Sequence, residues 1–190
     1  MMYSGADMKR AIENGQLKVD PYYEASLRPV GMVLHLGAEL LKPLPGKTVD
    51  VKNRVTPDFK KITLTEDKPY ELQPGEFVLG ATYETVTVGS DIGLLLEGRS
   101  TLARVGLTIV QTAMLVYPGH TDRAITLEIV NNGVNPVLLY LKMKVARAAV
   151  FELKTASVTS YDDTGKYRNQ PTVGQPIFES EILIEPEDVK

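Results

Sequence analysis

The sequence predicts a mainly β fold, a β-sandwich or a jelly-roll-like barrel, and three observations support this prediction. Short apolar or alternating runs recur from residue 29 onward, and Gly, Pro, Asp and Asn separate them. Helical periodicity is confined to one segment near the N-terminus and to a short turn after residue 99. The 190 residues suit one domain with a core of its own. Many short strands with little helix are typical of sandwiches and jelly rolls.

Each expected element has a local signal in the sequence. Residues 6–14 predict a short helix, because Met8, Ala11 and Ile12 share one face and an Asn-Gly pair follows. A short extended piece comes next and ends at an Asp-Pro turn. The Asn-Asn-Gly run at 131–133 predicts a hairpin turn between two strands. The expected strands are 30–36, 61–65, 70–73, 77–88, 92–96, 107–117, 124–130, 136–141 and 145–153.

Composition restricts the possible functions. The net charge of −3 argues against general nucleic-acid binding, which requires a basic face. The chain has no cysteine, and His35 and His120 are its histidines, so disulfides and a zinc site built from Cys and His are excluded. No apolar run reaches the length of a membrane span, and the first residues lack the features of a secretory signal. We therefore expect a cytoplasmic protein that binds neither nucleic acid nor membranes.

The most informative stretch is Glu-Gly-Arg-Ser-Thr-Leu-Ala-Arg at 97–104. It places two guanidinium groups, two hydroxyls and a glycine where an apolar strand gives way to a helical turn. Free backbone N–H groups at such a junction, together with these side chains, suit a phosphate. The alternative is that Ser100 caps the turn while the leucines pack in a core. That alternative gives no reason for Arg99 and Arg104.

A polar tail follows the last expected strand. Residues 161–170 are Tyr-Asp-Asp-Thr-Gly-Lys-Tyr-Arg-Asn-Gln, and prolines at 171 and 176 interrupt regular structure. One interpretation is a solvated linker. The other is a segment that folds over a site, because Lys166, Tyr167, Arg168 and Gln170 lie close together in the sequence.

Together, the motif at 97–107 and Gly-Lys-Tyr-Arg-Asn-Gln at 165–170 resemble the dCTP deaminase family of the trimeric dUTPase-like superfamily. Asn-Gly-Gln-Leu near residue 15, His-Leu-Gly at 35–37, Leu-Gln-Pro-Gly-Glu-Phe at 72–77 and Ala-Ile-Thr-Leu-Glu-Ile at 124–129 agree in order. The resemblance implies a distorted β-barrel or jelly roll of the dUTPase-like type, with a short N-terminal helix and a C-terminal arm. It implies one domain over 1–190 and a mobile segment at 155–175 that closes over the nucleotide. It also implies a homotrimer whose sites are shared between neighbouring subunits.

The activity that the resemblance implies is hydrolytic deamination of dCTP, or of a close pyrimidine nucleotide, to dUTP and ammonia. Mg²⁺ would arrive on the triphosphate, with no zinc or other metal bound by the protein. Ser100 and Glu128 match residues that hold and activate the attacking water, helped by the carbonyl of Ala113, and Arg104 matches the arginine beside them. A single carboxyl group can accept the proton of that water and then donate it to the leaving ammonia. The positions matching the nucleotide-binding side of the site are Arg99, Ser100, Thr101, Tyr117, Tyr161, Lys166, Tyr167 and Gln170.

The chain also departs from the family pattern. Family members carry Arg and then Asp where this chain has Leu115 and Tyr117, and they carry Ser-x-Asp where it has Gly31 and Val33. One extra residue lies between positions 119 and 128. These differences concern the sugar and base side of the pocket, not the residues matched to water activation.

Several alternatives therefore stay open beside the deaminase. The first is a dUTPase-like or bifunctional dCTP deaminase and dUTP diphosphatase. The second is a non-catalytic trimeric nucleotide-binding protein on the same scaffold, and the third is a β-sandwich interaction domain without a nucleotide site. At the level of residues, Glu128 could face solvent as an ordinary strand residue, and His120 is expected to be a loop histidine.

Overall fold

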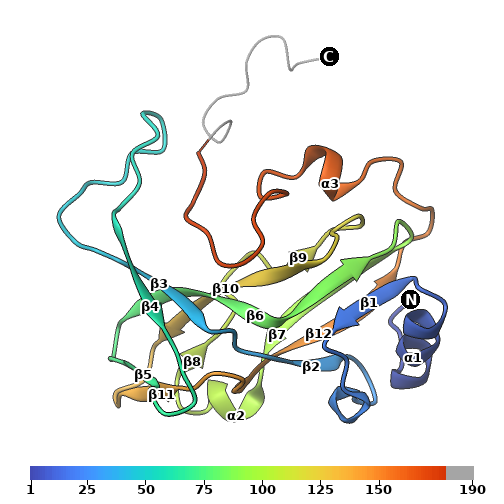
Figure 1. Ribbon diagram of the computed structural model, residues 1–190, viewed down its shortest axis with the longest axis horizontal. Helices are drawn as coiled ribbons and strands as arrows, with labels where there is room; N and C mark the ends of the chain where they lie inside the picture. The colour runs from blue at the N-terminus through green and yellow to red at the C-terminus, as the bar shows by residue number, and fades with distance from the viewer. Residues whose placement is uncertain (179–190) are drawn as a thin grey trace.

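Two main antiparallel sheets and a small two-stranded sheet form the fold, as the computed structural model shows for residues 1–178 (Figure 1). Helix is confined to short pieces, so the predicted mainly β class is confirmed. The helical elements are α1 (Gly5–Glu13), the 3-10 turn η1 (Glu24–Ser26), α2 (Ser100–Ala103) and α3 (Tyr161–Thr164). The strands are β1 (Leu17–Asp20), β2 (Met32–His35), β3 (Glu39–Pro43), β4 (Phe59–Thr63), β5 (Tyr70–Leu72), β6 (Phe77–Val88), β7 (Ile92–Gly98), β8 (Leu107–Thr108), β9 (Leu115–Val116), β10 (Arg123–Asn131), β11 (Val137–Leu139) and β12 (Lys144–Glu152).

The larger sheet has the strand order β4-β3-β6-β10-β8. Strand β10 pairs along one edge of β6, while β3 and β1 share the other edge. The second sheet has the order β2-β12-β7-β9, and β5 pairs with β11 in a small sheet of their own. Within residues 1–178, the last strand of each main sheet does not pair with the first strand of the same sheet. The result is an open, distorted sandwich of the jelly-roll type and not a closed barrel.

The main core lies between the two sheets, and alternation along the strands places it there. In β10, Ile125, Leu127 and Ile129 are buried, while the residues between them are less buried. A period of two sends alternate side chains to opposite faces of a sheet, so these three enter one core with residues of β6, β7 and β12. Helix α1 begins with a capping box between Ser4 and Asp7, and its Met8 and Ala11 are buried.

A second, smaller apolar cluster lies outside the main core. Leu79 and Ala81 of β6 are buried together with Val173, and Phe59 and Phe77 pack against them. Because β6 contributes alternate residues to both clusters, the larger sheet is covered on both faces. The segment that contains Val173 therefore packs on the larger sheet as part of the fold.

One predicted strand is wrong, and β3 and α3 were not predicted. Residues 107–117 do not form one strand, since β8 and β9 have two residues each and a loop joins them. In that loop Ile109 is buried in the main core. No clear pattern in the sequence marks β3 or α3.

The predicted hairpin at 131–133 is wrong as well, because β10 and β11 do not pair with each other. Strand β11 pairs with β5 instead. The cause is Asn131, which is fully buried and whose amide nitrogen donates to the carbonyls of Leu72 and Asn135 at 3.0 and 2.9 Å. This side chain stabilises the path of the chain away from β10 and toward β5.

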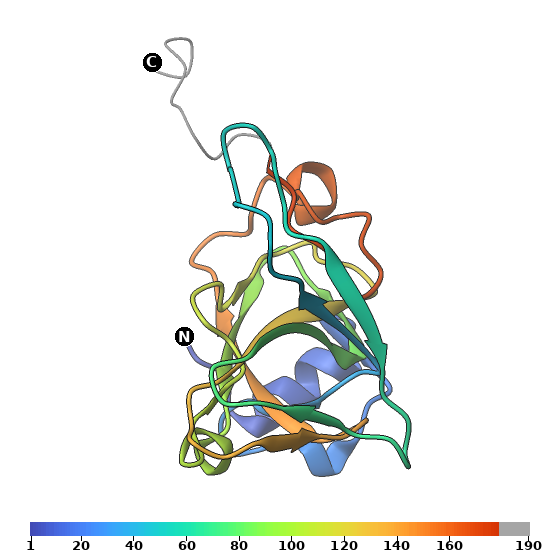
Figure 2. The same cartoon turned by 90° about the vertical axis from the view of Figure 1, so that its left-hand side faces the viewer.

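Different segments of the chain lie at the two ends of the molecule. The 44–58 connection between β3 and β4 and the segment around α3 project from the same end (Figures 1 and 2). Helix α2 lies at the opposite end in both views. This separation decides which of the predicted site residues can meet within one copy of the chain.

Candidate active site

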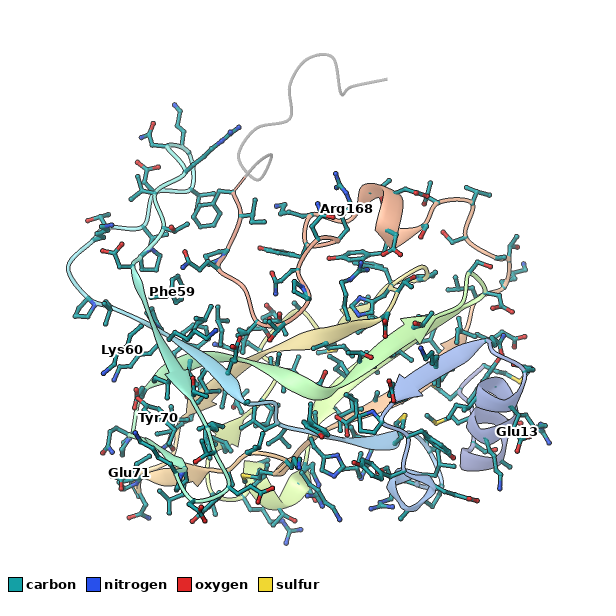
Figure 3. All side chains as sticks on the ribbon, viewed as in Figure 1. Glu13, Phe59, Lys60, Tyr70, Glu71 and Arg168 are labelled. Carbon is teal, nitrogen blue, oxygen red and sulfur yellow. The ribbon has the colours of Figure 1, made fainter. Side chains whose placement is uncertain are left out.

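A cavity of about 600 Å³ opens where β10, the 44–59 connection and the C-terminal segment come together. We call it the main cavity, and we call residues 160–171 the closing arm, after the role that the family resemblance implies for this segment. Figure 3 shows Phe59 near the top of β4 and Arg168 in the closing arm above β10. The main cavity is lined by Pro43, Val49, Pro57, Phe59, Phe77, Leu79, Ala113, Leu115, Val116, Tyr117, His120, Arg123, Ala124, Ile125, Thr126, Glu128, Tyr161, Tyr167, Gln170, Gly174, Pro176 and Phe178.

Glu128 is the carboxylate among these lining residues. Its neighbours Leu127 and Ile129 point into the main core, so the alternation of β10 turns Glu128 to the cavity side. The backbone N–H of Gln111 approaches its Oε2 at 3.4 Å. Burial raises the pKa of Glu128, and hydrogen bonding from backbone N–H groups opposes this effect. The group therefore holds a proton more readily than an exposed glutamate does.

The residues around α2 lie elsewhere in the molecule. Arg99, Ser100, Thr101 and Arg104 are absent from the lining of the main cavity, and α2 is at the far end of the molecule (Figure 1). The helix is preceded by Arg99 as its N-cap, with no side-chain capping bond, so Ser100 does not serve as the cap. Arg99 donates through Nη1 to the carbonyl of Lys144 at 3.1 Å.

The chain thus brings together only part of the predicted set. Around the main cavity it places Ala113, Tyr117, Glu128, Tyr161, Tyr167 and Gln170. The α2 group of Arg99, Ser100, Thr101 and Arg104 remains outside it. Lys166 lines a neighbouring hollow of about 610 Å³, whose wall shares Tyr117, Tyr161 and Tyr167 with the main cavity.

The closing arm joins the main cavity through its aromatic and amide side chains. Tyr161 stacks on Tyr117 with ring centroids 6.1 Å apart and an interplanar angle of 19°. Gln170 donates through Nε2 to the hydroxyl of Thr126 at 3.0 Å. These contacts place the arm over β10, the strand that carries Glu128.

Sequence reasoning missed the importance of two polar residues. His120 is buried with 9% of its surface exposed and lines the main cavity, where burial lowers its pKa. Arg123 lines the same cavity and forms an ion pair with Asp162. A usable signal did exist for Arg123, since it begins the strand that leads to Glu128. The apolar wall of Phe59, Phe77 and Leu79 was missed because no local pattern marks it.

Two further properties concern metals and membranes. Within residues 1–178, His, Asp and Glu side chains form no cluster of three that could hold a metal ion. No helix in this described part of the chain is long and apolar enough to cross a membrane.

A protein-family model and curated relatives match most of the chain. The model of the dCTP deaminase-like family matches residues 2–153. A dUMP-forming dCTP deaminase of Thermobifida fusca is 34% identical over 163 residues, which are 85% of this chain and 83% of the relative. A dCTP deaminase of Haloarcula marismortui is 33% identical over 178 residues, or 90% of this chain and 91% of the relative.

A solved structure shares the fold. The 2′-deoxycytidine 5′-triphosphate deaminase from Agrobacterium tumefaciens superposes with a TM-score of 0.59 at 14% identity, over 78% of this chain and 46% of that protein. The family match covers most of the chain, and the listed identities extend over most of both sequences. The resemblance predicted from the two motifs is thereby confirmed, and the chain belongs to the dCTP deaminase-like family.

Proposed function

We propose that the protein deaminates the cytosine ring of dCTP by adding water and releasing ammonia. The observation that carries this proposal is Glu128, a carboxylate with a raised pKa on the floor of a cavity large enough for a nucleoside. Family membership and the names of the relatives support the same reaction.

The chemistry requires one group that first accepts and then donates a proton. As water adds to C4, Glu128 takes its proton, and a C–O bond forms. Glu128 passes this proton to ring N3. As the C4–N bond breaks, the same carboxylate takes the proton of the new C4 hydroxyl and gives it to the leaving ammonia, so that C4 keeps a carbonyl. A pKa raised by burial brings the carboxyl group closer to the operating pH, where it can do both. The carbonyl of Ala113, at the edge of the same cavity, can orient the water.

A complete site requires a second subunit. In our proposal, the chain forms a homotrimer in which α2 of one subunit faces the main cavity of the next. Ser100 and Arg104 then stand beside the neighbour's Glu128, while Arg99 and Thr101 meet the triphosphate, which enters as its Mg²⁺ complex. Support comes from the position of α2, which lies outside the cavity of its own subunit.

The substitution Glu128→Gln tests the proposed role directly. It keeps the size of the side chain and removes the proton acceptor, so we expect ammonia release from dCTP to fall by about 10²–10⁴-fold. Calorimetry should show dCTP binding close to that of the wild type, because the amide still fills the same place. Unchanged turnover in Glu128→Gln contradicts the assignment.

A second candidate is the bifunctional reaction, and the name of the Thermobifida fusca relative as dUMP-forming favours it. In this chain Tyr117 offers a hydroxyl where the family resemblance leads us to expect a carboxylate. A water that hydrolyses the triphosphate would therefore lack a carboxylate base at this position. Measuring ammonia and pyrophosphate in one reaction separates the two: ammonia alone supports our first proposal, and equal amounts of both support the bifunctional enzyme.

A further inference from the structure

We propose that Arg123 is a positioning residue that holds the closing arm over the main cavity. Arg123 begins β10, the strand that also carries Glu128, whereas the arm follows the last strand of the fold. One side chain therefore connects the floor of the cavity to its cover. The kinetic part of this inference rests on the proposed function, but the attachment of the arm does not.

Arg123 reaches the arm at separate points. Its Nη2 forms an ion pair with the carboxylate of Asp162 in α3. Its Nη1 donates to the carbonyl of Arg168 at 2.6 Å. The guanidinium carbon also lies 5.6 Å from the ring centroid of Tyr161, within the range of a cation–π contact. The planar fork of an arginine can make these contacts at once, and a lysine ammonium cannot reproduce their geometry.

The surroundings strengthen these contacts. The side chain of Arg123 is 12% exposed and that of Asp162 is 37% exposed, so the pair is partly shielded from water. Charge-assisted hydrogen bonds are the stronger kind, and partial burial reduces their screening. Burial acts to raise the pKa of Asp162, but the hydrogen bonds from Thr121 and Arg123, together with the positive charge of Arg123, keep this pKa below its usual value. The arm is thus attached by a charged contact and not by apolar packing alone.

The attachment matters because the arm presents the residues that cover the cavity. Tyr161 stacks on Tyr117, and Gln170 donates to Thr126 two residues before Glu128 in the sequence. Farther along, the carbonyl of Pro171 lies 3.4 Å from the backbone nitrogen of Ala124. Without Arg123, Tyr161 and Gln170 are no longer held at a fixed distance from β10, which forms the floor of the cavity. Arg123 acts on the reaction through these side chains.

The first experiment measures the arm without any nucleotide. Hydrogen exchange of residues 160–171 is followed by mass spectrometry in wild type, Arg123→Lys and Asp162→Asn. We expect exchange to become about tenfold faster in both variants, as the loss of a charge-assisted hydrogen bond predicts. The matched control is Arg10→Lys, which alters an exposed Arg–Asp ion pair on α1 and should leave the arm unchanged. If Arg123→Lys folds poorly, Asp162→Asn decides whether this ion pair attaches the arm, because Asp162 lies in α3 and outside the core.

The second experiment measures dCTP deamination by the same proteins. We expect kcat/KM to fall about tenfold in Arg123→Lys and in Asp162→Asn, and the double variant to fall no further than either alone. Unchanged exchange in both single variants overturns the proposal, and a lower kcat/KM with an unchanged arm assigns Arg123 to direct substrate contact. If the wild type deaminates nothing while the variants exchange faster, the attachment stands and the proposed function fails.

Discussion

Glu128 shows at the scale of one residue how strand periodicity and burial together raise the pKa of a carboxyl group in a cavity. Its neighbours Leu127 and Ile129 are apolar, so the sequence already indicated that Glu128 faces away from the core. The sequence could not show whether that outer face meets water or a cavity. The segments that cover it lie far away in the chain, at 44–59 and 161–178. Only the tertiary structure therefore reveals the burial that raises the pKa.

His120 leads to a prediction about pH. Burial is the largest cause that lowers its pKa below the usual 6.5, and the positive charge of Arg123 adds to it. The unfolded chain then binds a proton that the folded protein does not, so the free energy of unfolding falls as the pH drops from 6.5 through the lowered pKa. Each unit of difference in pKa corresponds to roughly 1.4 kcal/mol at most. Chemical denaturation over this range should show a weaker pH dependence in His120→Gln, and identical slopes contradict the account.

At the scale of elements, the turn before β10 controls how closely the arm approaches. Gly119 has a φ of +78°, and a Cβ built there would stand 2.0 Å from the hydroxyl oxygen of Ser160. Ser160 in turn caps α3 through its side chain, and the N–H of Tyr161 donates to the carbonyl of Pro118 at 2.9 Å. No signal in the sequence indicates that Gly119 meets Ser160, which lies 41 positions later in the chain.

Gly15 provides a matched comparison for this contact. It has the same φ of +78°, but a Cβ built there meets nothing within 4 Å. The change Gly15→Ala should therefore cost only the backbone strain, about 1–2 kcal/mol. Gly119→Ala should cost more than Gly15→Ala in urea unfolding, and it should also speed hydrogen exchange in the closing arm. Equal effects of the two substitutions contradict the close approach of Ser160.

At the scale of the whole molecule, the two groups of residues in the proposed site, those at α2 and those around the main cavity, lie at opposite ends. The β class and most of the strands could be predicted from the sequence, and both motifs could be found in it, because alternation and local turn chemistry depend on neighbouring residues. The sequence could not place the motif at α2 relative to Glu128, since that relation depends on packing between distant segments. In the trimer that we propose, a head-to-tail ring of identical subunits would bring each α2 to the next cavity, and the closed ring would repeat that contact at every interface.

Mixed trimers test this shared site most directly. Glu128→Ala and Arg104→Ala are each expected to be inactive alone, because each subunit lacks one half of the site. When the two are co-expressed in equal amounts, every mixed trimer contains one interface where an intact Glu128 meets an intact Arg104. Random assortment then predicts deamination of dCTP at about a quarter of the wild-type rate per subunit. Activity that stays at the level of the separate variants, in trimers shown to be mixed, contradicts a site shared between subunits.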